Sequence, residues 1–163
     1  MKQEDYGENY RIHFLEQYKI CVEMADRVSV RRGQANTFYI SLLSAILALL
    51  SLIIDKNLFA GSSKILLFFT SILALALCFT WYVNIQSYKQ LNSLKFKVIN
   101  EMEQHLPFAC YSREWEILKE KQKNGDKQYV RLTAIEKFVP LIFAVPYFGL
   151  LVYTLLVFAK VLK

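Results

Sequence analysis

Three long runs without a charged residue alternate with polar segments along this chain. The runs cover residues 38–54, 65–83 and 139–159 and contain 17, 19 and 21 residues. A helix needs about 17–25 mainly apolar residues to cross the hydrocarbon core of a bilayer. The short polar link between the first two runs, DKNLFAGSSK, leaves room only for an antiparallel arrangement. The pattern therefore predicts three membrane spans, of which the first two form a helical hairpin.

Apolar residues also recur at helical spacing on either side of this hairpin. Before the first run, a 4-3-4-3 spacing that is typical of a coiled-coil seam connects Phe14, Tyr18, Cys21, Ala25 and Val28. After the second run, Lys95 interrupts a similar row formed by Tyr88, Leu91, Val98 and Met102. Pro107 is the first residue there that should stop a helix. We therefore expect two helices of about 42–47 residues, roughly 65–70 Å long, each extending well beyond its span.

The distribution of lysine and arginine predicts the orientation of the spans. The segment before the hairpin carries six of the 20 basic residues, and the segment between the second and third runs, residues 84–137, carries ten. The hairpin link and the C-terminal end carry two each. Basic residues concentrate on the cytosolic side of membrane proteins. The N-terminal segment and the long loop are therefore predicted to be cytosolic and the C-terminus external.

The expected fold is an all-α membrane protein. It consists of a long antiparallel transmembrane helical hairpin with cytosolic helical extensions, followed by a third, proline-kinked transmembrane helix. Pro140 and Pro146 each remove a backbone hydrogen bond, so the third helix should be kinked or have a broken first half. By segment, we expect a cytosolic helix over 1–37, the hairpin over 38–83, a cytosolic helix with a basic loop over 84–138, and the third span with the C-terminus over 139–163. Within the loop, SREWEILKEKQK is typical of a short amphipathic helix with Ser112 as its N-cap.

The two cytosolic helices are predicted to pair in a definite register. Aligning the membrane boundaries of the two spans places residues at equal depth when their numbers sum to about 121. The opposite-charge pairs are Asp26 with Lys95, Glu23 with Lys97, and Lys19 with Glu101 or Glu103. The apolar pairs are Cys21 with Ile99, Tyr18 with Met102, and Val28 with Leu94. The alternative is that the helices separate and pack against neighbouring subunits.

Little in the sequence indicates catalysis or the binding of a cofactor. The three cysteines are odd in number and form no CxxC motif, and the two histidines, His13 and His105, have no ligand partner at metal-binding spacing. The net charge of +6 is explained by the flanks of the spans and not by a nucleic-acid recognition module. We expect no enzyme, no cofactor, no metal and no nucleic acid. Arg27, Arg31 and Arg32 are positioned either to bind anionic lipid head groups or simply to flank the membrane.

Small residues recur at one-turn spacing within the first two spans. They are Ser41, Ser44, Ala45 and Ala48 in the first span and Thr70, Ala74 and Cys78 in the second. Such faces let helices approach closely, either within one chain or between subunits. None of the three runs contains the charged residue on which proton- or ion-coupled transport usually depends. Ser41, Ser44 and Ser51 are the only candidates in the first span for a polar stripe along a pore.

Several segments together resemble a known family. They are YKICVEMADRVSVRRGQANTFYISLLSAIL, SYKQLNSLKFKVINEMEQHLP, the dipeptide Glu114–Trp115, LTAIEKFVP and the last span. They are similar to the RipA-like small bacterial inner-membrane proteins, which are described as octameric. The resemblance implies a homo-oligomer in the bacterial cytoplasmic membrane that supports envelope integrity or growth inside host cells. An arginine-rich helix leading into a two-span hairpin is also similar, more loosely, to SLATT-type effectors of bacterial conflict systems. A structural scaffold is the favoured hypothesis, and an oligomeric pore is the alternative.

Overall fold

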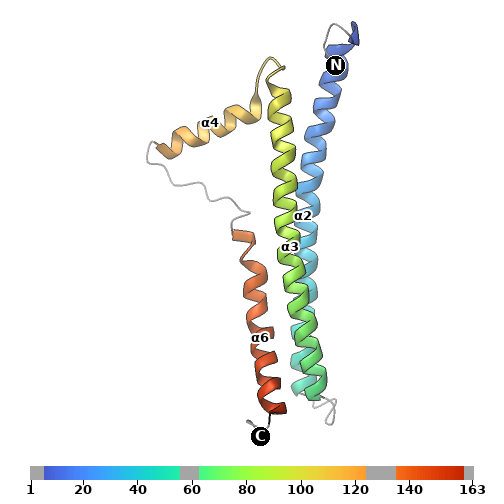
Figure 1. Cartoon of the computed structure of the whole chain (residues 1–163), viewed down its shortest axis with the longest axis vertical. Coiled ribbons are helices and arrows are strands. Elements are labelled where there is room, and N and C mark those ends of the chain that lie inside the picture. Colours follow the sequence, from blue (N-terminus) through green and yellow to red (C-terminus); the bar gives the residue numbers. More distant parts are fainter. Residues whose placement is uncertain (1–5, 56–62, 124–134, 160–163) are drawn as a thin grey trace. The chain divides into compact units, whose positions relative to one another are not determined.

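The computed structural model describes residues 6–55, 63–123 and 135–159, and its elements there are helices (Figure 1). Helix α2 covers Tyr10–Asp55, α3 covers Ser63–Glu103, α4 covers Cys110–Lys123 and α6 covers Val139–Phe158. No strand occurs in these three ranges. The prediction of an all-α chain is confirmed. The link over residues 56–62 and the loop over residues 124–134 lie outside the described residues.

Helices α2 and α3 have 46 and 41 residues, against the predicted length of about 42–47, so α3 is one residue shorter than expected. Neither contains proline, and Gly33 is accommodated inside α2 without interrupting it. At about 1.5 Å per residue they measure roughly 69 and 62 Å, about twice the thickness of a hydrocarbon core. Helices α2, α3 and α6 are each long and apolar enough to cross a membrane. The chain is therefore an all-α membrane protein.

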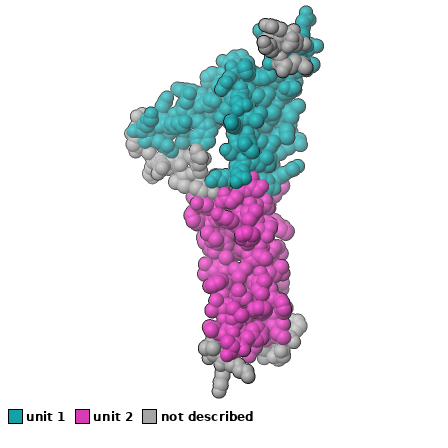
Figure 2. Space-filling view, viewed as in Figure 1, with its two compact units in different colours: residues 1–31, 88–131 teal, residues 32–87, 132–163 magenta. Residues whose placement is uncertain are grey.

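The structure divides into two compact units, and both long helices contribute to each of them (Figure 2). Unit 1 contains residues 1–31 and 88–131, and unit 2 contains residues 32–87 and 132–163. Contacts in unit 1 join Tyr18 to Glu103 and Phe14 to His105, so residue numbers rise along α2 as they fall along α3. The two helices are therefore antiparallel in this unit.

Unit 2 is a three-helix bundle around Trp81, whose side chain is 1% exposed. The indole stacks on Tyr39 of α2, with ring centroids 5.6 Å apart, and meets the edge of Phe143 of α6 at 5.8 Å. Tyr147 of α6 is also fully buried, and its hydroxyl donates a hydrogen bond to the carbonyl oxygen of Leu43. The remaining core residues are Leu50, Leu67, Ala74, Cys78 and Ile85.

The two prolines of the third span are both accommodated within α6. Pro140 lies in the first turn, where its missing N–H costs no helical hydrogen bond, and Pro146 lies in the interior. The helix continues through Pro146 as far as Phe158. This continuity excludes the broken first half that was one of the two expectations for this span.

In unit 1, α2 and α3 are in contact, but the inward side of α3 differs from the seam read from its sequence. On α2, Ala25 is buried and Phe14, Tyr18, Cys21 and Val28 are partly buried. On α3 the inward residues are Asn92, Phe96, Ile99 and Glu103. Leu91, Leu94 and Val98 are instead 43%, 63% and 48% exposed, so the expected Val28–Leu94 pair is not an inward one.

Candidate functional site

The structure separates the two sets of small residues that the sequence singles out. Ala74 and Cys78 of α3 are 0% and 4% exposed within unit 2, and Thr70 is partly buried. On α2 the four small residues are all exposed, and we call them the α2 stripe: Ser41, Ser44, Ala45 and Ala48. The small residues of α3 therefore serve packing within the chain, whereas the α2 stripe remains open.

Two hydroxyl groups of α2 in unit 2 bond within their own helix. Thr37 Oγ1 donates to the carbonyl oxygen of Gly33 at 3.1 Å, and Ser51 Oγ donates to that of Ala48 at 2.8 Å. Such bonds satisfy a hydroxyl without water or a partner. These polar side chains are therefore compatible with a lipid or a protein environment.

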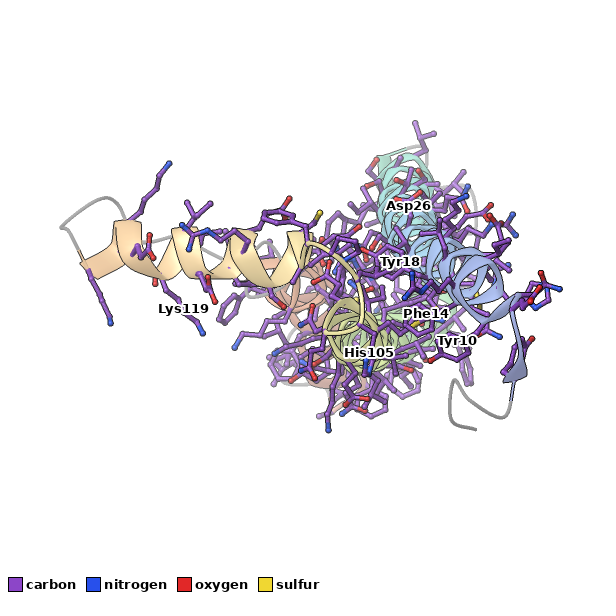
Figure 3. All side chains as sticks on the ribbon, turned by 90° about the horizontal axis from the view of Figure 1, so that it is seen from above. Tyr10, Phe14, Tyr18, Asp26, His105 and Lys119 are labelled. Carbon is purple, nitrogen blue, oxygen red and sulfur yellow. The ribbon has the colours of Figure 1, made fainter. Side chains whose placement is uncertain are left out.

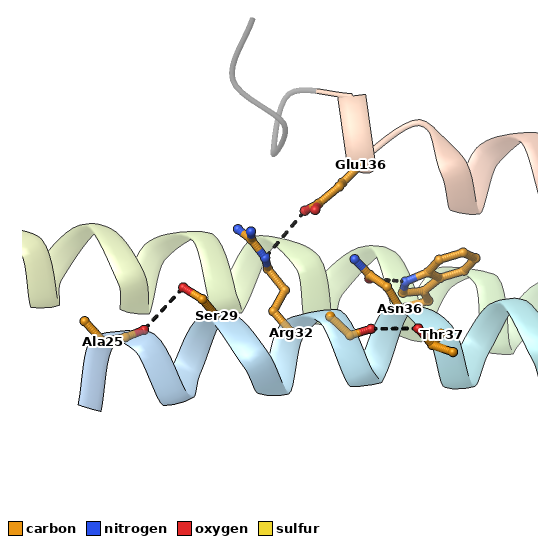
Figure 4. Close-up of polar contacts among 8 residues, drawn as sticks. Ala25, Ser29, Arg32, Asn36, Thr37 and Glu136 are labelled. Carbon is orange, nitrogen blue, oxygen red and sulfur yellow. Dashed lines mark hydrogen bonds and ion pairs between the residues drawn. The ribbon is translucent and has the colours of Figure 1, made fainter. Parts of the chain in front are cut away.

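In unit 2, polar contacts join α2 to α3 and to the segment before α6; Figure 4 shows Arg32, Asn36 and Glu136 among them. The indole Nε1–H of Trp81 donates to Asn36 Oδ1 at 2.8 Å. Arg32 Nε lies 3.6 Å from Oε2 of Glu136, three residues before α6, and these side chains are 19% and 25% exposed. A partly buried ion pair is costly to break on one side, because the remaining charge loses its partner. Arg32 and Glu136 thus connect α2 to the segment that leads into α6.

These contacts bear on the three arginines considered for lipid binding. Arg32 is engaged by Glu136, and Arg27 pairs with Glu23 of its own helix at 2.7 Å. Arg31 is exposed and makes no ion pair with any residue that the structure describes. Of the three, Arg31 is the side chain most available to a phosphate group, and lipid binding stays a prediction.

Unit 1 contains a buried carboxylate that receives three hydrogen bonds. Glu103, 1% exposed, accepts one from the Tyr18 hydroxyl at 3.1 Å and two from the backbone N–H groups of Tyr111 and Ser112, at 3.0 and 3.2 Å. Burial, and then the bond to Glu103, raise the pKa of Tyr18 to about 12, so this phenol remains a donor at physiological pH. Figure 3 shows Tyr18 on the ribbon of α2, viewed from above.

The Glu103 carboxylate lies at the N-terminus of α4, where unpaired N–H groups and the helix dipole favour a negative charge. This corrects the expected N-cap, because α4 begins at Cys110 and Ser112 gives its backbone N–H to Glu103. The phenyl ring of Phe96 also meets Tyr111, with centroids 5.4 Å apart. Glu103 and Phe96 together attach α4 to α3.

Two charged residues of the predicted zipper, Lys19 and Glu23, form ion pairs within α2. Lys19 pairs with Glu16 at 2.7 Å, and Glu23 pairs with Arg27, both within α2. Asp26, Lys95 and Lys97 have no ion pair within residues 6–55, 63–123 and 135–159. Ile99 is fully buried, Cys21 and Met102 are partly buried, and the Tyr18–Glu103 bond joins residues whose numbers sum to 121. The residue pairs of the zipper remain a prediction.

No metal-binding cluster forms in the part of the chain that the structure describes, since no three His, Cys, Asp or Glu side chains gather there. His13 accepts or donates a hydrogen bond with the Tyr6 hydroxyl at 2.9 Å, and the ring of His105 contacts Phe14 at a centroid distance of 6.0 Å. Both histidines therefore have aromatic neighbours from unit 1.

Comparison with known proteins identifies the chain at the level of a family. No curated protein and no solved structure matches it. A family model does match, over residues 15–156, and this range includes most of α2, all of α3 with Glu103, most of α6, and the α2 stripe. The chain belongs to the octameric membrane protein family (8xMP).

Proposed function

We propose that this protein is a non-catalytic scaffold whose copies associate side by side in the bilayer and whose cytosolic helices form a shared platform. The observation that carries the proposal is the exposure of the α2 stripe, while the small residues of α3 are used within the chain. Members of its family are described as octameric, so the neighbour that meets this stripe is another copy.

The chemistry of the α2 stripe favours a helix as its neighbour. Lipid tails are as apolar as leucine, so helices in a bilayer attract one another through close packing and interhelical hydrogen bonds. Ala45 and Ala48 allow a close backbone approach, and Ser41 and Ser44 offer hydroxyls to a neighbouring helix. A scaffold assembled through this stripe needs no ligand and no reaction.

A pore is the second candidate, because exposed hydroxyls along α2 could also line a water-filled passage. Ser41, Ser44 and Ser51 are exposed and lie on this helix. Ser51 already bonds to the carbonyl oxygen of Ala48, which reduces its need for water. The scaffold proposal therefore predicts a bilayer-spanning assembly that does not conduct.

Recording from planar bilayers that contain the purified protein distinguishes the two functions. The expected result is the absence of unitary currents while the protein is demonstrably inserted. Reproducible unitary currents that are lost when Ser44→Leu fills the stripe would instead support the pore. Leu49→Phe is the control, because it keeps a large apolar side chain at a position that is 59% exposed on the same helix but outside the α2 stripe.

We further propose that the protein resides in a bacterial cytoplasmic membrane with its N-terminus and long loop in the cytosol. The six and ten basic residues of those segments, against two and two on the other side, support this orientation. Alkaline phosphatase fused to the C-terminus should then be active, and a fluorescent protein fused there should be dark. The opposite pair of results would contradict the external C-terminus.

A further inference from the structure

Helix α3 carries an exposed apolar row in unit 1, formed by Leu91, Leu94 and Val98, which we call the α3 flank. The three side chains are 43%, 63% and 48% exposed. Their spacing of three and four residues puts them on one side of the helix, as in one half of a coiled-coil seam. The α3 flank therefore has the form of a surface that packs against another helix.

The partner helices that the structure describes lie on other sides of α3. Ile99 and Glu103, 0% and 1% exposed, are on the side that faces α2, since Glu103 bonds to Tyr18. Phe96 contacts Tyr111 at the start of α4. At about 100° per residue, Phe96 points almost opposite to the middle of the α3 flank. Within residues 6–31 and 88–123, the exposed part of α3 consists of the α3 flank and of polar positions such as Gln90, Ser93 and Lys97, so the flank is its apolar part.

Lipid does not account for this exposure. The apolar run of α3 ends at Val83, and the α3 flank lies eight to fifteen residues further along the same helix. At 1.5 Å per residue this is about 12 to 22 Å beyond the run, outside the hydrocarbon core. Exposed leucines within a span meet acyl chains, whereas these side chains meet water unless a protein covers them. A row of exposed apolar side chains in water marks an interaction surface.

We propose that the α3 flank binds the outer face of α2 in a neighbouring copy of this chain. A closed ring of identical subunits joins two different faces of each subunit. If the axis of the ring is the membrane normal, residues that touch across the contact between two copies lie at the same depth. The Tyr18–Glu103 bond places residues 91–98 level with residues 23–30 of α2. There α2 exposes Val30, 52% accessible, one turn after exposed Asp26.

The charges of the two faces are complementary. Lys95 and Lys97 border the α3 flank, whereas Asp26 lies one turn before Val30 and the Glu23 carboxylate is paired with Arg27. Neither lysine has an ion-pair partner among the described residues, and neither does Asp26. Opposite charges around an apolar centre select the partner and its register more than they add affinity. The inference rests on the proposed scaffold, because it names where neighbouring copies meet outside the bilayer.

Site-specific photocrosslinking in native membranes tests this contact. The photoreactive residue p-benzoylphenylalanine replaces Leu94 in the full chain, and the same residue at exposed Ser93, which points away from the α3 flank, is the control. Irradiation at position 94 should produce a band of twice the monomer mass, with adducts in the α2 peptide around residues 23–30. Position 93 should not produce this band.

Three outcomes would overturn the inference, and the first two separate it from the proposed function. If native mass spectrometry shows an intact oligomer but position 94 gives no chain-to-chain adduct, the contact is wrong and the scaffold stands. Adducts only to another protein, or to a part of the second copy outside α2, also overturn the contact. If the unmodified protein is monomeric in mild detergent, the scaffold proposal itself fails, and the inference fails with it.

Discussion

Replacing Trp81 with alanine is expected to destabilise the three-helix bundle by about 3 kcal/mol. Trp81 is 1% exposed, contacts Tyr39 of α2 and Phe143 of α6, and donates a hydrogen bond to Asn36. The substitution leaves a cavity shared by all three helices and an unpaired amide oxygen. Unfolding by titration with sodium dodecyl sulfate in mixed micelles measures the loss.

Two control variants separate packing from hydrogen bonding in this prediction. Trp81→Phe keeps an aromatic ring but removes the N–H donor, so it should cost only about 1 kcal/mol. Phe79→Ala removes a ring that is 69% exposed on the same helix and should change the unfolding free energy very little. Equal losses for Trp81→Ala and Phe79→Ala would show that Trp81 does not hold the bundle together.

Replacing Glu103 with glutamine is expected to loosen the start of α4. The carboxylate accepts backbone N–H bonds from Tyr111 and Ser112 and a hydroxyl bond from Tyr18. The amide group of glutamine has only one oxygen, and it presents an NH₂ group to at least one of these donors. Hydrogen bonds to a charged group contribute about 1.5–3 kcal/mol each. A loss of about 2 kcal/mol would speed amide exchange at the start of α4 roughly thirtyfold.

Hydrogen–deuterium exchange with peptide resolution measures this effect, with Glu101→Gln as the matched control. Glu101 is exposed on the same turn of α3, so its replacement should leave exchange at residues 110–114 unchanged. Tyr18→Phe removes one donor of the three and should have a smaller effect than Glu103→Gln. Unchanged exchange in Glu103→Gln would mean that Phe96 and Tyr111 hold α4 without the carboxylate.

The three spans and the two long helices could be predicted because their signals are local. An uncharged run of spanning length has few alternative structures, and α2 and α3 contain no proline that would stop them early. The family resemblance likewise depends on segments that can be recognised one at a time. For these features, the sequence pattern and the structure agree.

The rotation of α3 in unit 1 could not be predicted from its own sequence. Leu91 and Val98 form a better apolar row than Asn92 and Ile99, yet the latter lie inward. The rotation brings Glu103 to Tyr18 and to the N-terminus of α4. The apolar pattern of α3 alone cannot predict that Glu103 lies inward, because its carboxylate is stabilised by donors from α2 and α4. The predicted seam also assumes that the apolar row faces the same chain, whereas an oligomer offers a second neighbour.

The buried role of Glu103 was missed because glutamate is almost always exposed. Its position near the end of α3 suggested a surface ion pair with Lys19, which pairs instead with Glu16. Pro107 gave the relevant signal: it predicts an interruption between two helices, and the N–H groups of Tyr111 and Ser112 in the next helix do return to Glu103 at the end of α3. A carboxylate at that place is stabilised by those donors.

Native mass spectrometry of the α2 stripe variant tests the central claim most directly. The account predicts that the unmodified 19.1 kDa chain assembles into an octamer in mild detergent, and that Ser44→Phe with Ala48→Phe releases smaller species. Leu49→Phe, which places a phenyl ring at a side chain 59% exposed outside the α2 stripe, should leave the octamer intact. An octamer that survives the stripe variant as well as the control would contradict assembly through the α2 stripe.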